Sequence, residues 1–387
     1  MNPSFVLVVN PGSASRKYAL FADSVERAQL HFEWSNDTIL CTLTTTSQQH
    51  VKVDVTSLEN ATAEVIPILR SYNILSENEH IKYIGLRIVA PGSYFLSDHR
   101  VDDELMKHLQ QAKEHAPLHV KASLTELSYL QQYFPDSPIF AISDSAFHHT
   151  KPDHTWNYGI SLELADKHDI KRFGYHGLSV ESVVRQISPV EKSIVCHLGS
   201  GASVTALLNG QSVDTTMGFS PLEGVIMSTR SGSIDLAAAN ILKKILQYDD
   251  LSLEKYLNEE SGLKGLGGSA DIRELLLHEG EGDARAHLAL ETYVYTIQKS
   301  IGQMAAALNG VDALIFTGTV GERSSPIRKQ IVRQLNYLGF MIDNTRNDTT
   351  DSHGILTIHD PSSKPIYVIP AHEEQEIAKR VLIVASA

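Results

Sequence analysis

The chain has 387 residues, of which 42% are hydrophobic, so it is long enough for two or three domains with sizeable cores. Its 33 basic and 46 acidic side chains give a formal net charge of −13, which argues against binding to nucleic acid or to an anionic membrane surface. An anionic substrate would therefore need a locally basic pocket. Two cysteines are too few for a disulfide framework, and no apolar run reaches membrane-spanning length, so we expect a cytoplasmic protein.

Short apolar runs in the first half predict strands, and one longer amphipathic run predicts a helix. The strands are expected at Phe5–Val9, Tyr18–Phe21, Thr38–Thr44, His50–Val55 and Tyr83–Val89, and the helix at Asn60–Tyr72. The first run continues into a Gly/Ser-rich turn in VLVVNPGSAS (residues 6–15). This pattern predicts a β-hairpin whose backbone N–H groups can approach an anion closely.

The second half repeats this order. The run IVCHLGSGAS (residues 194–203) again joins an apolar strand to a Gly/Ser-rich turn, and the predicted strands are Ser193–His197, Val204–Leu208, Gln211–Thr215 and Ala313–Thr317. One such hairpin proves little, because glycine in a tight turn often serves only the backbone. Two in one chain predict a duplicated domain with a phosphate chain held between the halves, and hence a phosphoryl-transfer enzyme.

Helical periodicity and turn residues complete the outline. Apolar residues between Leu290 and Leu308 follow steps of four and three, and Asn309-Gly310 ends that predicted helix. The final segment predicts a strand, a break at Pro370 and a closing helix. Alternating strands and helices indicate an α/β protein. The turn-rich segment His148–Trp156 contains three histidines, which favour a solvated boundary loop over a metal site because no acid or cysteine accompanies them at ligand spacing.

Three basic side chains stand out as candidates for anion binding. Arg16 and Lys17 follow the first hairpin turn, and Arg87 interrupts the apolar strand YIGLRIVA. A buried, unpaired guanidinium is costly, so Arg87 should face a pocket, an acid or a ligand anion, with a purely structural Arg–carboxylate pair as the alternative. A fourth, Arg230, lies among small residues in TRSGSID, which leaves its guanidinium accessible to phosphate or carboxylate.

Acidic and histidine candidates are less specific individually. Asp144 ends an apolar strand, where an acid can bind a metal or only cap a turn. Glu373 begins the last helix, where acids are favoured by the helix dipole regardless of function. His119, His176 and His197 occur next to glycine or in other tight Gly- or Pro-containing contexts, and each has a structural explanation as well as a ligand-binding one.

Ten motifs in order together resemble one family, the acetate kinases. They run from residue 6 to about 380 and read NPGSASRK, GLRIV, APLH, ISDSAFH, FGYHG, HLGSGAS, DTTMGFSPLEG, TRSGSID, FTGTVGE and IPAHEE. The resemblance implies an α/β fold of duplicated ribonuclease-H-like (actin-like ATPase) domains with an inter-domain cleft. Residues 1–148, joined by the C-terminal helix at about 375–387, would form the first domain, and residues 149–374 the nucleotide-side domain.

The resemblance also implies roles for individual residues. The implied catalytic residues are Arg87, His119, Asp144, His176 and Arg230. The implied acyl-binding residues are Arg87, Val89, Leu118, Tyr175 and Pro221. The implied nucleotide and phosphate ligands are Ser13, Ser15, Lys17, His197, Gly199, Ser200, Gly201, Asp271, Arg273, Gly318, Thr319 and Gly321. The implied ligands of Mg²⁺ (or Mn²⁺) are Asn10 and Glu373.

The reaction that the resemblance implies is reversible, in-line transfer of the γ-phosphoryl group of ATP to acetate, giving ADP and acetyl phosphate, in a homodimer. No general base is needed, because a carboxylate is already ionised at neutral pH. Thr319 and Arg323 replace a Gly and an Asn of the family's nucleotide turn, which leaves pyrophosphate open as the phosphoryl donor. Propionate is the alternative acceptor, and a nucleotide-binding actin-like switch or an inactive paralogue is the alternative class.

Overall fold

The computed structural model describes residues 4–12, 15–35, 38–53, 55, 57–188, 190–349 and 354–386. The chain divides into two compact units. Unit 1 comprises Met1–Ala146 and His372–Ala387, and unit 2 comprises Phe147–Ala371. Each unit contains one β-sheet with helices packed against it.

Unit 1 is built on a sheet with the strand order β5-β4-β3-β2-β1-β6-β8-β7. Its strands are β1 (Phe5–Pro11), β2 (Ser15–Ala22), β3 (Val25–Ser35), β4 (Thr38–Thr44), β5 (Gln48–Val51), β6 (Ile81–Ile88), β7 (His99–Arg100) and β8 (Ile139–Ser143). Its helices are α1 (Ala61–Ser71), α2 (Asp103–His115), α3 (Pro117–Tyr133) and α14 (Glu373–Val384), with short 3₁₀ turns η1 (Leu58–Asn60) and η2 (Ser93–Leu96).

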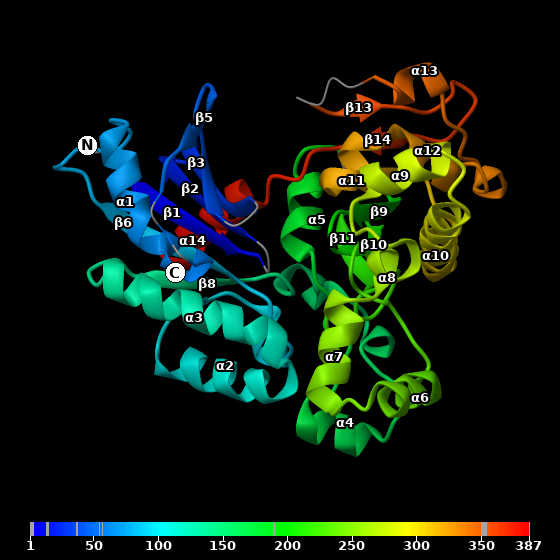
Figure 1. Ribbon diagram of the computed structural model, residues 1–387, viewed down its shortest axis with the longest axis horizontal. Coiled ribbons are helices and arrows are strands. Elements are labelled where there is room, and N and C mark those ends of the chain that lie inside the picture. Colours follow the sequence, from blue (N-terminus) through cyan, green and yellow to red (C-terminus); the bar gives the residue numbers. More distant parts are fainter. Residues whose placement is uncertain are drawn as a thin grey trace. The chain divides into compact units, whose positions relative to one another are not determined.

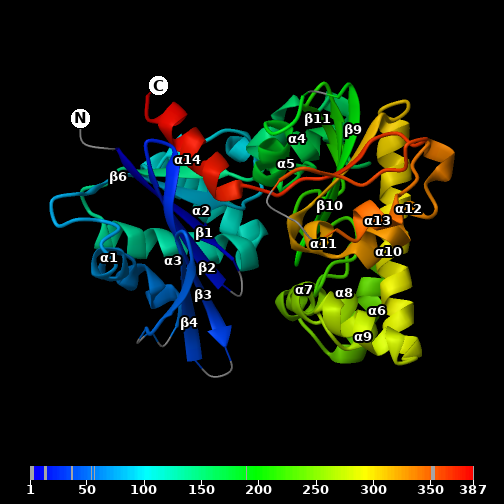
Figure 2. The same ribbon diagram turned by 90° about the horizontal axis from the view of Figure 1, so that it is seen from above.

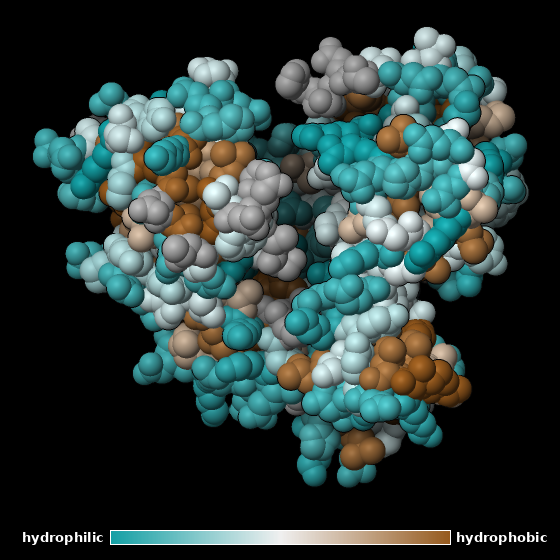
Figure 3. Space-filling view, in the orientation of Figure 1, coloured by the Kyte–Doolittle hydropathy of each residue, from teal (hydrophilic) through white to brown (hydrophobic). Residues whose placement is uncertain are grey.

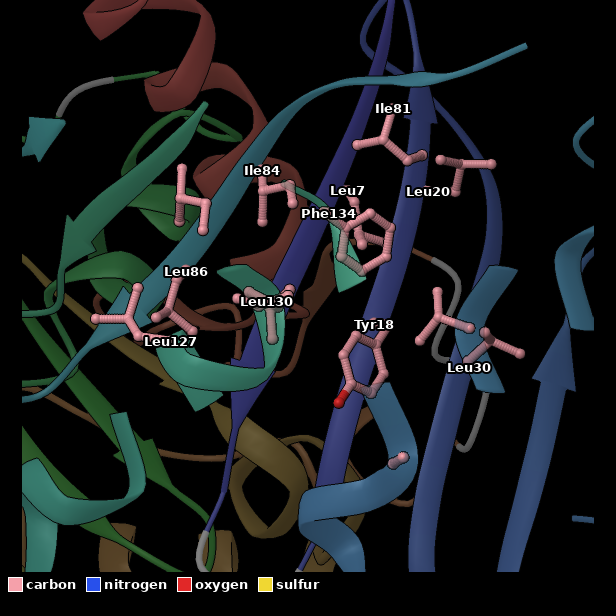
Figure 4. Close-up of a cluster of buried hydrophobic side chains, with 14 of the residues drawn as sticks. Leu7, Tyr18, Leu20, Leu30, Ile81, Ile84, Leu86, Leu127, Leu130 and Phe134 are labelled. Atoms are coloured by element: carbon pink, nitrogen blue, oxygen red, sulfur yellow. The ribbon is translucent and has the colours of Figure 1, made fainter. Parts of the chain in front are cut away.

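The core of unit 1 lies between its sheet and α3. Strand β1 is almost entirely apolar and buried, as expected of a central strand covered on both faces. Figure 4 shows Leu127 and Leu130 of α3, with Phe134 just beyond it, against sheet residues that include Leu7 and Ile84. The carboxyl-terminal helix α14 packs against β1, β6 and β8 (Figures 1 and 2), so the last element of the sequence belongs to the first unit.

Unit 2 is built on a sheet with the strand order β11-β10-β9-β12-β14-β13. Its strands are β9 (Lys192–Leu198), β10 (Ala202–Leu208), β11 (Gln211–Thr215), β12 (Ala313–Thr317), β13 (Leu356–Thr357) and β14 (Ile366–Val368). Its helices are α4 (Leu162–His168), α5 (Gly177–Val184), α6 (Leu236–Leu246), α7 (Asp250–Glu259), α8 (Gly262–Gly267), α9 (Ile272–Gly280), α10 (Ala284–Ala307), α11 (Gly318–Arg323), α12 (Ser325–Val332) and α13 (Asn344–Asn347). Short 3₁₀ turns are η3 (Ala146–Thr150), η4 (Asp153–Thr155) and η5 (Asn336–Leu338).

The two sheets share one core topology. In unit 1, β1 pairs antiparallel with β2 and parallel with β6, and β6 pairs parallel with β8. In unit 2, β9 pairs antiparallel with β10 and parallel with β12, and β12 pairs parallel with β14. A third antiparallel strand, β3 or β11, follows the hairpin in each. This is the ribonuclease-H-like order twice over, and it confirms the predicted duplication.

Most predicted elements are present with shifts of one to three residues at their ends. The long helix α10 stops where expected, because Asn309 and Gly310 both adopt positive φ angles that end a helix. Two predictions for the first sheet were wrong. Strand β3 was missed, although Ala28, Leu30 and Phe32 alternate with polar residues, and the strand expected at His50–Val55 ends at Val51.

Across the described residues, none of the helices combines the length and apolar character that crossing a bilayer requires.

Candidate active site

Unit 1 contributes a cluster centred on Arg87. This residue projects from β6, and its Nη2 donates to Asp144 Oδ2 at 2.8 Å while its Nη1 donates to Asn10 Oδ1 at 3.1 Å. Nη1 also lies 3.5 Å from Glu373 Oε2. Burial by itself would lower the pKa of Arg87, but Asp144 and Glu373 more than compensate, and the pKa is raised. From the sequence, Arg87 was expected to face a pocket, an acid or a ligand anion. In the structure it faces two acids, Asp144 and Glu373.

Strand topology explains why these side chains meet. The parallel strands β1, β6 and β8 are neighbours, so Asn10, Arg87 and Asp144 come from or just follow the carboxyl ends of three adjacent strands. Ligand sites in open α/β sheets lie at such ends. The fourth component, Glu373, is the first residue of α14, which packs on the same strands.

Asn10 also binds Glu373 and adds one further carboxylate, Glu374, to the cluster. Its Nδ2 donates to Glu373 Oε2 at 3.3 Å and to Glu374 Oε1 at 3.2 Å. The described residues contain no group of three or more His, Cys, Asp or Glu side chains placed to hold a metal ion. Mg²⁺ usually takes only one or two carboxylates and completes its shell with phosphate oxygens and water. An amide and two carboxylates at one place therefore fit Mg²⁺ or Mn²⁺ bound together with phosphates.

The first hairpin turn is stabilised by hydrogen bonds from Arg16. Gly12 N donates to Ser15 O at 2.9 Å, and Arg16 donates to the carbonyl oxygens of both Gly12 and Ser15. Arg16 is 5% exposed, and its Nε donates to buried Glu126 at 3.2 Å. Its charge is thus neutralised inside unit 1, whereas the sequence suggested an open positive charge beside the turn. Lys17 is exposed, Ser15 is half-buried, and the predicted ligand Ser13 lies outside the described residues.

Glu126 completes that support. Its Oε1 accepts from the hydroxyls of Tyr18 (2.9 Å) and Thr62 (2.8 Å). Burial raises the pKa of Glu126, while these hydroxyls and Arg16 act in the opposite direction. The sequence offered no signal for this residue, because it comes from the middle of α3.

Unit 2 contributes a second cluster around the turn between β9 and β10. Gly199 N donates to Gly201 O at 2.9 Å. A Cβ at Gly201 would lie 3.1 Å from His176 Nε2 and 3.4 Å from Arg230 Nη1, so the bare backbone of Gly201 separates these two side chains. The structure therefore brings together three of the predicted residues, and the absence of a side chain at Gly201 makes that possible. Ser200, at the tip, is exposed.

His176 is fixed in place by its surroundings. It has a φ of 59° at the start of α5, and its Nδ1 lies 3.0 Å from Ser203 Oγ. Its ring stacks on His197 at a centroid distance of 4.1 Å, and His197 Nδ1 in turn lies 2.7 Å from Ser179 Oγ. These hydroxyls orient both rings.

The backbone before His176 is supported by buried His148. Nε2 of His148 lies 2.9 Å from Tyr175 O, and Nδ1 lies 2.8 Å from Ser212 Oγ. His148 was expected in a solvated loop, which is wrong for this residue, although His149 and His154 are exposed.

The segment DTTMGFSPLEG is bound to the segment that carries His176. Gly174 N donates to Gly218 O at 3.2 Å, and Tyr175 Oη donates to Phe219 O at 2.7 Å. Glu223 accepts hydrogen bonds from Tyr158 and Arg172, and its carboxylate fills the space where a side chain at Gly218 would be. The motif is thus a folded loop with an internal acid. Of the predicted acyl-binding residues of unit 2, Pro221 is buried within this loop and Tyr175 is buried beside it.

The turn after β12 forms α11, and it needs one glycine rather than two. Gly318 has a φ of 77°, and a Cβ there would lie 2.7 Å from Leu198 O. Thr319 is exposed and is not among the residues with positive φ, so it fits without backbone strain. Gly321 is buried, and its carbonyl accepts from Arg328 Nη1 at 2.9 Å. Burial lowers the pKa of Arg328 to about 10.

The remaining predicted residues are less closely connected. Asp271 caps α9 and forms an ion pair with Arg273 at 2.5 Å, and hydrogen bonding to Arg273 lowers the pKa of Asp271. Within the described residues, the hydrogen bonds of this pair do not extend to the hairpin or to α11. Val89 is half-buried just after β6, and Leu118 and His119 lie in α3, with the side chains of both outside the described part.

A duplicated ribonuclease-H-like fold, with glycine-rich hairpin turns and charged clusters in both halves, defines a phosphotransferase of the actin-like ATPase fold. The sequence profile described as the acetokinase family matches residues 5–379. The chain belongs to this family, whose members are kinases that phosphorylate a carboxylate.

Relatives cover nearly the whole chain. It is 39% identical to the acetate kinase of Protochlamydia amoebophila over 97% of this chain and 98% of that one, and 36% identical to the acetate kinase of Thermoanaerobacterium thermosaccharolyticum over 97% of each. Among solved structures, a propionate kinase from Francisella tularensis matches with a TM-score of 0.89 at 32% identity, covering 98% of this chain and 100% of that one. Porphyromonas gingivalis acetate kinase matches with a TM-score of 0.85 at 29% identity, covering 99% and 100%.

Proposed function

We propose that this protein transfers the γ-phosphoryl group of ATP reversibly to acetate, giving ADP and acetyl phosphate. The observation that carries the proposal is the unit 1 cluster, in which a guanidinium, an amide and three carboxylates converge (Asn10, Arg87, Asp144, Glu373 and Glu374). Such a cluster can hold a divalent metal, and a bound metal together with the guanidinium would offset the carboxylates and allow an anionic substrate to bind beside them, as phosphoryl transfer requires.

The clusters of the two units take different parts of the same reaction in this proposal. Arg87 binds the acceptor carboxylate and the transferred group, with Asp144 and Glu373 fixing its guanidinium. Arg230 and His176 donate to the phosphoryl oxygens as charge develops on them. The two hairpin turns bind nucleotide phosphates through backbone N–H groups, supported by Ser15 and Lys17 in one unit and His197 and Ser200 in the other. Their glycines leave the backbone accessible.

Electrostatic stabilisation supplies most of the rate enhancement. The nucleophile and the phosphoryl group are both anionic, so preorganised cations lower the barrier chiefly by cancelling their repulsion. Asn10 and Glu373, with Glu374 beside them, would hold Mg²⁺, which when bound spreads the negative charge of the phosphates. Removal of one preorganised donor of this kind costs about 3–4 kcal/mol in comparable enzymes, so Arg230→Met should lower kcat/KM at least ~100-fold.

ATP is proposed over pyrophosphate because Thr319 is exposed and its replacement of a glycine causes no backbone strain in the turn after β12. The glycine that the turn after β12 needs is Gly318, and Thr319 has an ordinary backbone conformation. Acetate is proposed as acceptor from the names of the relatives, and propionate is the second candidate because of the similarity to a propionate kinase structure. The bonded hydroxyl of Tyr175 supports a small apolar acyl group.

The experiment is an acyl hydroxamate assay with acetate and with propionate, each tested with ATP and with pyrophosphate in the presence of Mg²⁺. We expect product from acetate with ATP, loss of product with EDTA, and strong loss in Arg230→Met. Product formed with pyrophosphate but not with ATP would show that pyrophosphate is the phosphoryl donor. A higher kcat/KM for propionate than for acetate would show that propionate is the preferred acceptor. No product with any donor and any short carboxylate would refute the proposal.

We also propose a cytoplasmic homodimer that contacts its second copy through α6. Leu236, Ile241 and Ile245 on this helix are 75%, 58% and 69% exposed. Figure 3 shows hydrophobic residues gathered over α6, at the lower right of the view. Apolar patches of this kind mark protein interfaces.

The cytoplasmic location is proposed from the cysteines. Cys41 and Cys196 are both free and buried, as expected in a reducing compartment.

A further inference from the structure

A carboxylate outside the clusters described above touches two of the elements that carry their acids. Asp98 lies between η2 and β7, and its Oδ1 accepts from Ser143 N at 2.8 Å. Ser143 is the last residue of β8 and immediately precedes Asp144. Asp98 therefore fixes the backbone from which Asp144 reaches Arg87.

The same carboxylate binds α14. Arg380 Nε donates to Asp98 Oδ2 at 2.7 Å, and Arg380 Nη2 donates to Asp98 Oδ1. The two side chains are 8% and 9% exposed, so this bidentate pair is shielded from solvent. Arg380 follows Glu373 by seven residues, or about two helical turns, and so lies on the same face of α14. Asp98 thus fixes the register of the helix that presents Glu373 to Arg87 and Asn10.

Packing reinforces this attachment. A Cβ at Gly85 of β6 would lie 2.5 Å from Val381 and 2.8 Å from Ile377, so α14 rests directly on the backbone of the strand that carries Arg87. Side-chain volume at Gly85 would lift the helix from the sheet. The apolar contact sets the height of α14 above the sheet, and the ion pair sets its position along the sheet.

The places where the chain leaves and re-enters unit 1 explain why such an attachment is needed. Asp144 precedes Ala146, the last residue of the first segment of unit 1, by two positions, and Glu373 directly follows His372, the first residue of the returning segment. Both acids are therefore next to segments that continue into unit 2. An attachment made wholly within unit 1 keeps their positions independent of those segments.

We propose that Asp98, paired with Arg380, is a positioning residue for phosphoryl transfer, which fixes Asp144 and Glu373 relative to Arg87. This inference rests on the proposed function for its effect on the reaction. Residues that orient groups around a metal or a reacting centre typically change activity or metal affinity by about 10- to 100-fold when altered. A misplacement of about 1 Å has a similar effect.

The test compares Asp98→Asn, Arg380→Lys, Arg380→Gln and the double variant Asp98→Asn/Arg380→Gln with the wild type. In Asp98→Asn the amide oxygen can still accept the hydrogen bond from Ser143 N. The amide NH₂ group then faces Arg380 Nε, so two donors meet where a carboxylate oxygen accepted before. We expect kcat to fall about tenfold or more in Asp98→Asn, with less than about threefold changes in the KM values. Arg380→Lys should retain an intermediate kcat, and the double variant should lose no more than the more damaged single variant, because both changes remove one interaction.

Two readouts do not depend on turnover. Mn²⁺ binding, followed by electron paramagnetic resonance, should weaken about tenfold in Asp98→Asn, and a crystal structure of that variant should show the Glu373 carboxylate displaced from Asn10. The control is Val65→Ala, which removes buried volume from α1 in the same unit and should lower stability without changing Mn²⁺ binding.

The outcomes separate this inference from the proposed function. Wild-type protein without acyl phosphate formation refutes the function, whereas the Mn²⁺ and crystallographic readouts still test the role of Asp98. Unchanged Mn²⁺ binding and an unmoved Glu373 in Asp98→Asn overturn the inference, even in an active enzyme. Equal loss of kcat in Asp98→Asn and in Val65→Ala also overturns it, because the effect would then reflect stability alone.

Discussion

At the scale of single residues, the absence of a side chain at Gly201 allows His176 and Arg230 of unit 2 to lie close together. The two predicted donors to phosphate, His176 and Arg230, both lie within van der Waals distance of the position that a Cβ on Gly201 would occupy. Gly201, the third member of the group, therefore contributes by having no side chain. Sequence reasoning identified all three residues but not this relation between them.

Substitution of Gly201 tests that relation. Gly201→Ala places a methyl group 3.1 Å from His176 Nε2, so the imidazole or the turn must shift by a few tenths of an ångström. We expect kcat/KM to fall about tenfold, since such displacements of aligned groups are costly in transfer reactions. Gly159→Ala is the control, because a Cβ at Gly159 meets no atom within 4 Å. Equal kinetics for both variants in steady-state assays would contradict the relation.

A buried lysine gives the stability of the protein a pH dependence. Lys151 is 3% exposed, its Nζ donates to Arg172 O at 2.6 Å, and it lies 4.5 Å from the centre of the Trp156 ring. Burial lowers its pKa from 10.5 to about 8. Between these values the unfolded chain binds more protons than the folded protein, so the free energy of unfolding should rise with pH in that window.

The prediction concerns the difference in the free energy of unfolding between the wild type and Lys151→Met. From about pH 7.5 to about pH 10, the free energy of unfolding of the wild type should increase relative to that of Lys151→Met by about 2 kcal/mol, since each unit of pKa shift corresponds to about 1.4 kcal/mol. Urea denaturation at several pH values measures it. Exposed Lys107→Met should follow the wild type, and parallel curves for wild type and Lys151→Met would contradict the assignment.

At the scale of elements, loops gain their shape from partners that are distant in sequence. The loop DTTMGFSPLEG depends on Glu223, which accepts from Tyr158 and Arg172, 65 and 51 positions earlier. The first hairpin turn depends in the same way on Glu126 of α3, through Arg16. In each case a carboxylate behind the loop fixes the backbone that faces the site.

Neutralising Glu223 should therefore loosen the loop without destroying the fold. Glu223→Gln leaves Arg172 without its charged partner, and loss of a charged hydrogen bond typically costs about 1.5–3 kcal/mol. We expect the KM for the carboxylate to rise about tenfold with little change in the KM for the nucleotide, and faster amide exchange over residues 216–224. Glu291→Gln breaks an exposed pair with Arg333 and serves as the control. A rise in both KM values would argue against a local effect.

At the scale of the whole molecule, the surface proposed to contact a second copy is helix α6, one of several helices of unit 2 with exposed apolar side chains. Helix α6 exposes Leu236, Ile241 and Ile245, while Asp235 caps its start and Lys243 and Lys244 lie in its last turn. Ile241 and Ile245 are one turn apart and form an exposed apolar patch on one face of the helix, and Leu236 adds an exposed apolar side chain at its first position. This is the surface that we assign to the second copy of the chain.

Sedimentation velocity tests this assignment. The wild type should sediment as a dimer, and Ile241→Glu/Ile245→Glu should shift it to monomer, because two buried charges without partners are costly at an interface. Leu288→Glu is the control, since Leu288 on α10 is 61% exposed and apolar but lies outside α6. A monomeric wild type, or a dimer that survives the double change, would refute the assignment.

Much of the fold follows from local sequence. Both hairpins, the parallel strands and the end of α10 were predicted, because alternation of apolar residues and turn-forming residues are local signals. Strand β3 carried the same alternation at Ala28, Leu30 and Phe32 and was missed. The sites were harder. Arg87 was conspicuous as a charge inside an apolar strand, whereas Asp98, Glu126 and Ser203 resemble ordinary residues of their elements.

The amino-acid sequence by itself determined the family, the duplication and the kinds of charged group available, because motifs and periodicity are written in neighbouring residues. Only the tertiary structure decided which acid faces which arginine. That choice depends on strand order, on the return of α14 to the first sheet and on buried ion pairs such as Asp98–Arg380, which join residues 282 positions apart. No local pattern encodes such a contact, because its energy arises only when the folded chain removes both groups from water.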